Sequence, residues 1–356
     1  METNCIAFIV PAYNVENYID ACLDSIMKCK RQGDEIILIN DGSTDATESR
    51  CKAWVQNHAD QITFISQHNQ GLSAARNIGI RHSTAPYILF VDSDDVLIPT
   101  TVEQVRSVLD QYSPDILACD FEWWYPGQST AFKRSPPLSH TPNTLSTDTE
   151  KFLIETLEDS IFSACSRIFK SSLIQSLGPE VFPVGDAYEE IATVPRLTLR
   201  AKSLYYLNAP LLHYRVRPNS ITTTKSPKHC IDLAKSFCNY LQEIENFSPS
   251  DKTKIASNKA AIKLFMTALR DCGKTKDRDY SLYKRVSLIA RQNLSIPINS
   301  IIKELKLSSK QTDKRAANHL RFFNLSPNAF LLTRKLVYSL KSARNTAKYR
   351  LRRKTG

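Results

Sequence analysis

The sequence lacks a hydrophobic run long enough to cross a membrane. Its 356 residues contain no apolar stretch of roughly 18 residues, so a transmembrane helix is not expected. A secretory signal begins with a basic segment before its apolar stretch. Here the short apolar stretch Ile6–Val10 is preceded by Met1–Asn4, which contains no Lys or Arg. We therefore expect a cytoplasmic protein.

Paired cysteine motifs are absent as well. The chain has nine cysteines, an odd number, and no two of them form a C-x-x-C pair. This pattern is typical of reduced core thiols and gives little support for a zinc site. The motifs GxGxxG, GxxxxGK[ST] and GxSxG do not occur either, so dehydrogenases, P-loop kinases and serine hydrolases lack their usual signatures here.

Charge is divided unevenly along the chain, whose net charge is +11. Residues 1–226 contain 27 Asp and Glu against 19 Lys and Arg, whereas residues 227–356 contain 28 Lys and Arg against 9 Asp and Glu. This asymmetry predicts an acidic domain over 1–226 that performs chemistry and a basic region over 227–356 that binds an anionic surface.

The first 120 residues alternate between short apolar runs and helical patterns. Strands are expected at Ala7–Val10, Glu35–Asn40, Ile62–Ser66, Tyr87–Val91 and Asp115–Cys119. Helices are expected at Val15–Lys28, at Asp45–His58 with Thr44 as N-cap, at Leu72–His82 and at Pro99–Tyr112. Such alternation predicts an α/β fold with a mostly parallel sheet covered on both faces. Beyond Pro227 the pattern is helical.

Polar residues follow three of these strands. They occupy 11–14, 41–43 and 92–95, and in parallel α/β sheets ligands bind beyond the carboxyl ends of the strands. The triplet Asp92-Ser93-Asp94 presents alternate carboxylates, which suit Mg²⁺ or Mn²⁺. A solvated, Asp-rich turn before the next helix is the alternative.

Four segments together carry a family resemblance: IVPAYNVENYIDACLDSI, DEIILINDGSTDAT, NQGLSAARNIGI and YILFVDSDD. In order and spacing they resemble the donor-binding half of family 2 glycosyltransferases. The resemblance implies the Rossmann-like GT-A fold followed by a helical C-terminal region. It also implies an inverting transfer, dependent on Mn²⁺ or Mg²⁺, of a sugar from a nucleotide-sugar, with a UDP-sugar expected. The implied acceptor is a glycan or lipid-linked glycan in cell-surface polysaccharide synthesis.

The resemblance also implies roles for individual residues in the first part of the chain. Pro11, Ala12 and Tyr13 would line the pocket for the nucleotide base, and Asp41 would accept a hydrogen bond from the base. Arg76 would reach the diphosphate or hold the acidic cluster. A simple turn residue and a surface helix charge are the alternatives for Asp41 and Arg76.

The implied cation-binding and ribose-binding residues come from the D-x-D triplet. Asp92 and Ser93 would lie near the ribose, while Asp94, with Asp92, would bind the metal. His213 would be a further metal ligand, or else a packed histidine. Arg215 and Arg217 would approach the diphosphate or the acceptor.

An acidic pair, usually Glu-Asp in this family, corresponds to Glu189-Glu190 here. The resemblance implies that Glu190, with Glu189 as second choice, is the catalytic base that deprotonates the acceptor. Two acids that favour a helix N-terminus are the alternative. Because the second acid departs from the usual Asp, a non-catalytic carbohydrate-binding relative is a competing function. A sugar nucleotidyltransferase would need a glycine-rich loop where PAYNVE stands.

Residues 334–354 contain nine Lys or Arg and no acid. With leucines and alanines at near-helical spacing, 330–356 predicts a basic amphipathic helix on an anionic membrane surface, at the inner face of the cell membrane. A solvated basic tail is the alternative. A nucleic-acid partner is not expected, because no nucleic-acid-binding module is visible.

Overall fold

The structure is a computed structural model that describes residues 4–125, 132–217, 226–275, 280–294, 298–307 and 311–326, together with 329, 330 and 333. The chain divides into two compact units, Met1–Pro218 and Asn219–Gly356, which are described separately. The division of tasks expected at residue 226 stays a prediction.

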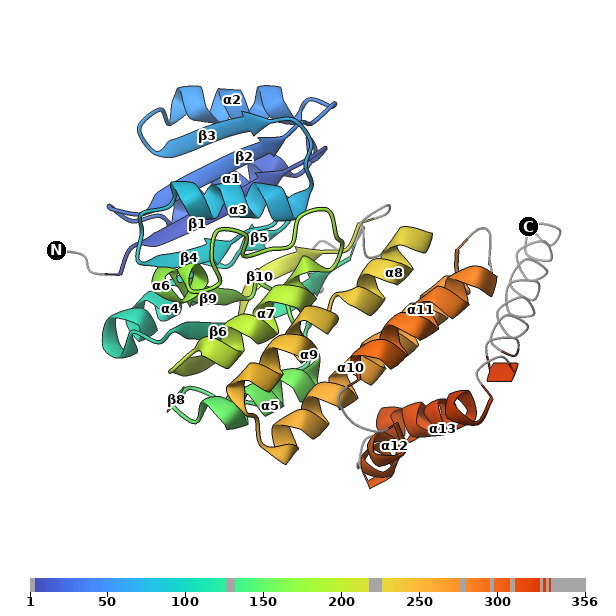
Figure 1. Cartoon of the computed structure of the whole chain (residues 1–356). Coiled ribbons are helices and arrows are strands. Elements are labelled where there is room, and N and C mark those ends of the chain that lie inside the picture. The colour runs from blue at the N-terminus through green and yellow to red at the C-terminus, as the bar shows by residue number, and fades with distance from the viewer. Residues whose placement is uncertain are drawn as a thin grey trace, which may run out of the picture. The chain divides into compact units, whose positions relative to one another are not determined.

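Four parallel strands form one half of the sheet in the first unit. They are β1 (Ile6–Ala12), β2 (Glu35–Asp41), β3 (Ile62–Gln67) and β4 (Tyr87–Phe90), in the order β3-β2-β1-β4 (Figure 1). Every residue of β1 and β4 is buried, which explains their nearly continuous apolar sequences. The predicted α/β class and these four strands are confirmed.

The other half of the sheet is mixed rather than mostly parallel. Strand β9 (Arg167–Lys170) lies antiparallel between β4 and β6 (Ile116–Trp124), and β6 pairs in parallel with β10 (Leu204–Arg215). Because β9 runs opposite to both of its neighbours, the carboxyl ends of β4, β6 and β10 lie at the same edge. The short strands β5 (Val96–Leu97), β7 (Lys133–Arg134) and β8 (Leu145–Ser146) pair antiparallel with β10, β6 and β10 respectively.

The helices of the first unit are α1 (Ile19–Cys29), α2 (Thr47–Asn57), α3 (Leu72–His82), α4 (Pro99–Tyr112), α5 (Thr149–Asp159), α6 (Ser171–Gln175) and α7 (Glu189–Arg200). Helix α2 begins later than predicted, and the carboxylate of Asp45, not Thr44, accepts a hydrogen bond of 2.9 Å from Thr47 N–H. Helix α3 lies in front of β1 in Figure 1 and packs closely on it. This close packing needs Gly79, because a Cβ there would lie 2.3 Å from Cγ2 of Ile9.

The second unit is helical where it is described, as predicted. It contains α8 (Pro227–Lys235), α9 (Cys238–Ile244), the 3-10 turn η1 (Glu245–Phe247), α10 (Asp251–Cys272), α11 (Tyr280–Asn293), α12 (Ile298–Leu307) and α13 (Gln311–Leu325). Ser226 and Ser250 cap α8 and α10 by accepting hydrogen bonds from backbone N–H groups. Residues 334–356 of the predicted amphipathic helix lie outside the described residues.

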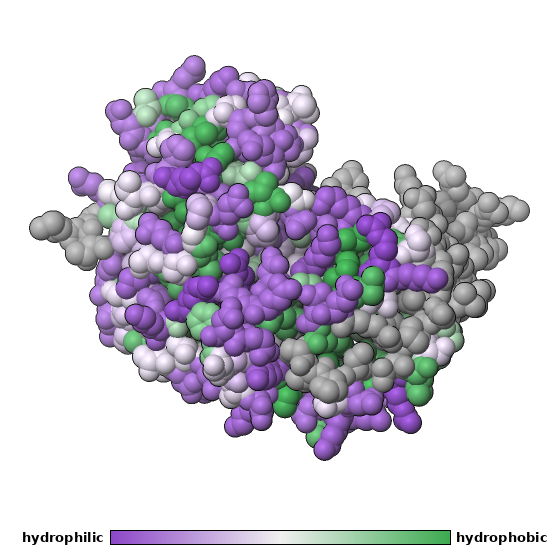
Figure 2. Space-filling view, viewed as in Figure 1, coloured by the Kyte–Doolittle hydropathy of each residue, from purple (hydrophilic) through white to green (hydrophobic). Residues whose placement is uncertain are grey.

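Figure 2 shows one face of the molecule coloured by hydropathy. On this face, apolar residues form small, separate groups among hydrophilic residues. Within the described ranges, no helix combines the length and the hydropathy needed to span a bilayer.

Candidate active site

The loops that follow β1 and β2 are tied to each other by side chains. Asn14, in the left-handed region with φ of 50°, accepts a hydrogen bond of 2.8 Å from Thr44 N–H. Thr47 Oγ1 accepts one of 2.7 Å from Val15 N–H. Between these anchored loops Tyr13 is 45% exposed, whereas Pro11 and Ala12 are buried in β1. An exposed aromatic ring beside a fixed backbone is a suitable surface for a base, and that role stays a prediction.

Asp41, the last residue of β2, is buried and organises the loop before α3. Its Oδ1 accepts hydrogen bonds from Gln67 Nε2 (2.6 Å) and Gln70 N–H (2.9 Å), and its Oδ2 accepts one from Gly71 N–H (2.8 Å). A carboxylate has about four acceptor sites, so one remains for a further donor. The carboxylate therefore has a structural task, and its predicted bond to a base stays a prediction.

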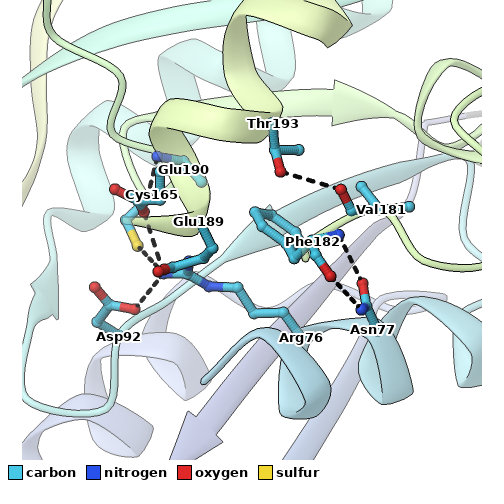
Figure 3. Close-up of polar contacts among 10 residues, drawn as sticks. Arg76, Asn77, Asp92, Cys165, Val181, Phe182, Glu189, Glu190 and Thr193 are labelled. Carbon is cyan, nitrogen blue, oxygen red and sulfur yellow. Dashed lines mark hydrogen bonds and ion pairs between the residues drawn. The ribbon is translucent and has the colours of Figure 1, made fainter. Parts of the chain in front are cut away.

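Arg76 is the centre of the site (Figure 3). It projects from α3 and is fully buried. Its Nη1 donates to Glu189 Oε1 (2.6 Å), and its Nη2 donates to Asp92 Oδ1 (2.9 Å) and Glu190 Oε1 (3.1 Å). Three carboxylates from two distant segments thus converge on one guanidinium. Arg76 therefore holds the acidic cluster, which is one of the two roles expected for it. Because Arg76 is buried, the alternative of a charge on the surface of a helix is wrong.

Sequence reasoning missed the groups that surround this arginine. The ring of Phe182 lies 5.2 Å from the guanidinium carbon, and Sγ of Cys165 lies 3.7 Å from Nη2. The loop that carries Phe182 is fixed by Asn77, whose amide exchanges two hydrogen bonds with the Phe182 backbone (2.8 and 3.0 Å; Figure 3). No local motif marks these residues, because only tertiary packing brings them to Arg76.

The two acids that open α7 have different environments. Glu189 is buried, whereas the side chain of Glu190 is 26% exposed. Glu190 Oε1 also accepts a hydrogen bond of 3.1 Å from Ala164 N–H, so two donors hold this one oxygen. Burial raises the pKa of Glu190 to about 7, with Arg76 opposing the rise and Glu189 and Asp92 adding to it. This carboxyl can therefore exchange a proton near neutral pH.

Arg215, the last residue of β10, and Arg217, two residues beyond it, hold the Asp94-Asp95 segment. Arg217 Nε donates to Asp94 Oδ2 (2.5 Å), and Arg215 Nε donates to the Asp94 backbone carbonyl (2.8 Å). Arg215 N–H donates to Asp95 Oδ1 (2.8 Å), while the buried Oδ2 of Asp95 has no partner. Burial, followed by the charges of neighbouring aspartates, raises the pKa of Asp94 and of Asp95.

The oxygen donors of this acidic cluster are of the type that divalent cations prefer. The ligands of such a cation would be Asp92 and Asp94, since hard oxygen donors suit Mg²⁺ or Mn²⁺ and the crowded carboxylates repel one another. In the described parts of the chain, no three His, Cys, Asp or Glu side chains are arranged as a metal-binding group. The structure therefore does not bring His213 together with Asp92 and Asp94.

His213 lies in a packed environment instead. Its ring stacks on Phe132 with centroids 3.9 Å apart, and its Nδ1 lies 3.2 Å from Glu122 Oε2, off the direction of a hydrogen bond. Burial lowers the pKa of His213, and Glu122 opposes this. This arrangement matches the packed alternative, and metal ligation by His213 stays a prediction without support from the geometry.

Known proteins resemble this chain in sequence and in fold. Residues 7–178 match the model of a family described as Glycosyl transferase family 2. Glycosyltransferase GlyA of Streptococcus pneumoniae serotype 4 is 33% identical over 63% of this chain. Minor teichoic acid biosynthesis protein GgaB of Bacillus subtilis is 27% identical over 62% of it. The chain spans only 32% of GlyA and 24% of GgaB.

Two solved structures share the fold at low sequence identity. TarS 1-349 of S. aureus, in complex with UDP-GlcNAc, has a TM-score of 0.61 and 16% identity over 95% of this chain and 92% of its own. Mannosyltransferase PcManGT of Pyrobaculum calidifontis, in complex with GDP-Man and Mn²⁺, has a TM-score of 0.52 and 17% identity over 92% and 89%. The match over residues 7–178, on a sheet of the expected kind, shows a glycosyl transferase family 2 domain in this part of the chain.

Proposed function

We propose that this chain is an inverting glycosyltransferase that moves a sugar from a nucleotide-sugar, with a UDP-sugar as the expected donor, to a glycan or lipid-linked glycan acceptor. The observation that carries the proposal is the convergence of Asp92, Glu189 and Glu190 on Arg76 at the carboxyl edge of the sheet, beside Asp94. The complexes of TarS with UDP-GlcNAc and of PcManGT with GDP-Man and Mn²⁺ support a nucleotide-sugar donor.

Glu190 is the better candidate for the catalytic base. Its Oε1 is fixed by Arg76 and Ala164, which leaves Oε2 to take the proton of the acceptor hydroxyl. Glu189 is more buried and bonds Arg76, so we propose that it positions the guanidinium. A single displacement, with the base opposite the departing nucleotide, inverts the anomeric carbon. When bound by Asp92 and Asp94, Mn²⁺ or Mg²⁺ supplies positive charge for the departing diphosphate.

The proposed acceptor is a glycan or lipid-linked glycan in cell-surface polysaccharide synthesis. GgaB is named for minor teichoic acid biosynthesis, which supports a cell-surface polymer as the acceptor class. The excess of Lys and Arg over residues 227–356 supports peripheral binding to an anionic membrane, where lipid-linked acceptors reside.

Release of a nucleoside diphosphate tests the activity. The full chain is incubated with Mn²⁺ and a panel of UDP-, GDP- and dTDP-sugars, and slow hydrolysis is measured without acceptor. We expect release from one donor class, and a loss of at least about a hundredfold in Asp94→Asn. Arg50→Gln, which breaks an exposed ion pair with Asp20, is the control. If no donor is hydrolysed but one binds, the non-catalytic alternative is favoured.

A further inference from the structure

The cation that neutralises Asp94 in this structure is a side chain of the same chain. Arg217 Nε lies 2.5 Å from Asp94 Oδ2, and the two side chains are 27% and 18% exposed. Both therefore remain in reach of solvent and of a ligand. Among the described residues, Arg217 is the ion-pair partner of the Asp94 carboxylate.

The backbone around Arg217 is held in place up to this residue. Val216 N–H donates to the Trp124 carbonyl (2.8 Å), and the guanidinium of Arg215 lies 3.6 Å from the ring centroid of Trp124. Arg215 also bonds the Asp94 carbonyl, as described above. The backbone just before Arg217 is thus anchored, through Arg215, to the acidic segment. The guanidinium of Arg217 contacts Asp94 and lies 5.6 Å from the ring centroid of Tyr18.

This geometry creates a competition for one carboxylate. A divalent ion bound by either oxygen of Asp94 competes with Arg217 for the negative charge of this carboxylate. A displaced guanidinium stays within reach because the backbone before it is anchored. Two cations at one aspartate repel each other, so an anion is needed between them. A diphosphate is that anion, and a guanidinium pairs with phosphate oxygens through a fork of N–H donors.

We propose that Arg217 is a donor-binding residue that serves as the counter-ion of Asp94 in the ligand-free chain and transfers to the diphosphate when metal and donor bind. The proposal rests on the proposed function, since it takes Asp94 as a metal ligand. It makes the binding of the divalent ion and of the nucleoside diphosphate mutually dependent: each alone binds weakly, and together they bind tightly.

Calorimetric titration of Mn²⁺ and of UDP, each in the presence and absence of the other, tests this coupling. In the wild-type chain we expect UDP to raise Mn²⁺ affinity by about fivefold or more. Uridine, which has no phosphate, should not raise it. Arg217→Gln should bind Mn²⁺ alone more tightly than wild type, bind UDP with Mn²⁺ more weakly, and lose most of the coupling. Arg217→Lys, which keeps the charge without the fork, should retain part of it.

The outcomes separate this inference from the proposed function. Arg50→Gln, whose ion pair with Asp20 is also 2.5 Å, should behave as wild type in all titrations. If the wild type binds Mn²⁺ and UDP cooperatively but Arg217→Gln does so equally well, the role of Arg217 is overturned. If the wild type binds neither Mn²⁺ nor any nucleoside diphosphate, the proposed function itself is overturned.

Discussion

At the scale of single residues, one cation balances three acids. Arg76 is fully buried, and Asp92, Glu189 and Glu190 all bond its two terminal nitrogens. The carboxylates dominate its environment, and they raise the pKa of Arg76 well above its usual value despite burial. Removing this cation leaves buried negative charge without a partner, which is far more costly than losing a surface ion pair.

Arg76→Met should therefore lower the free energy of unfolding by about 3–5 kcal/mol at neutral pH. The loss should shrink as the pH falls towards 5, because protonation of the carboxyls relieves their repulsion. Urea denaturation at both pH values measures this. Arg50→Met, at an exposed pair, should cost no more than about 1 kcal/mol. Equal costs for the two variants would contradict the role assigned to Arg76.

The pKa of Glu190, raised to about 7, predicts a pH dependence of transfer. A base acts as the carboxylate, so kcat/KM should be constant above about pH 7 and fall about tenfold per unit below it. Glu190→Gln should lower turnover by about a hundredfold or more while donor binding persists. Glu190→Asp, the residue usual at this position in the family, should keep part of the activity and the acid limb. Near-normal turnover in Glu190→Gln would show that the base is misassigned.

At the scale of elements, helix α3 connects the parts of the site. Its N-terminus donates to Asp41 through Gly71 N–H, and one turn further its Arg76 binds Asp92. The helix can approach β1 closely because residue 79 has no side chain. A Cβ there would overlap Cγ2 of Ile9, which is fully buried.

Gly79→Ala should destabilise the chain by about 1–3 kcal/mol and weaken donor binding, because α3 must shift with Arg76. Ile9→Ala provides the space that the new methyl group needs. A double-mutant cycle in urea should therefore give a cost for the pair that is smaller than the sum of the two single costs by about 1 kcal/mol or more. Additive costs would indicate that α3 does not meet β1 at this point.

At the scale of the whole molecule, charge is distributed by region. Residues 1–226 carry an excess of acid that includes the site, and residues 227–356 carry 28 Lys and Arg. None of the described helices of the second unit is long and apolar enough to span a bilayer. We expect binding at a membrane surface to depend on the basic residues of this region.

Deletion of residues 334–356 should abolish binding to vesicles that contain anionic lipid. Phe330 is 1% exposed, so the deletion starts beyond it to leave that packing intact. Co-sedimentation with phosphatidylglycerol vesicles measures the effect, with phosphatidylcholine vesicles as the control and an unchanged thermal transition as the check of folding. A membrane role for this segment would be contradicted if the full chain did not bind the vesicles, or if the shortened chain still bound them.

The predictable part of the fold is local. Strands β1 to β4 and helices α3 and α4 follow the predicted ranges closely, because buried strands need continuous apolar runs and helices need a repeating apolar face. The order and antiparallel direction of β9 were not predicted, since a strand of four residues has no distinctive pattern. Its position decides that β6 and β10 deliver their ends to the same edge as β4.

The sequence by itself determined the residue types of the site and the edge at which Asp41, Asp92 and Asp94 lie, because those acids directly follow apolar strands. Only the tertiary structure decided their partners. It buried Arg76 among three carboxylates, turned Asp41 towards the loop before α3, and placed Arg217 on Asp94 and His213 on Phe132. Two of these pairings, Arg76 with Glu189 and Arg217 with Asp94, join residues more than a hundred positions apart. They depend on packing that no local pattern encodes.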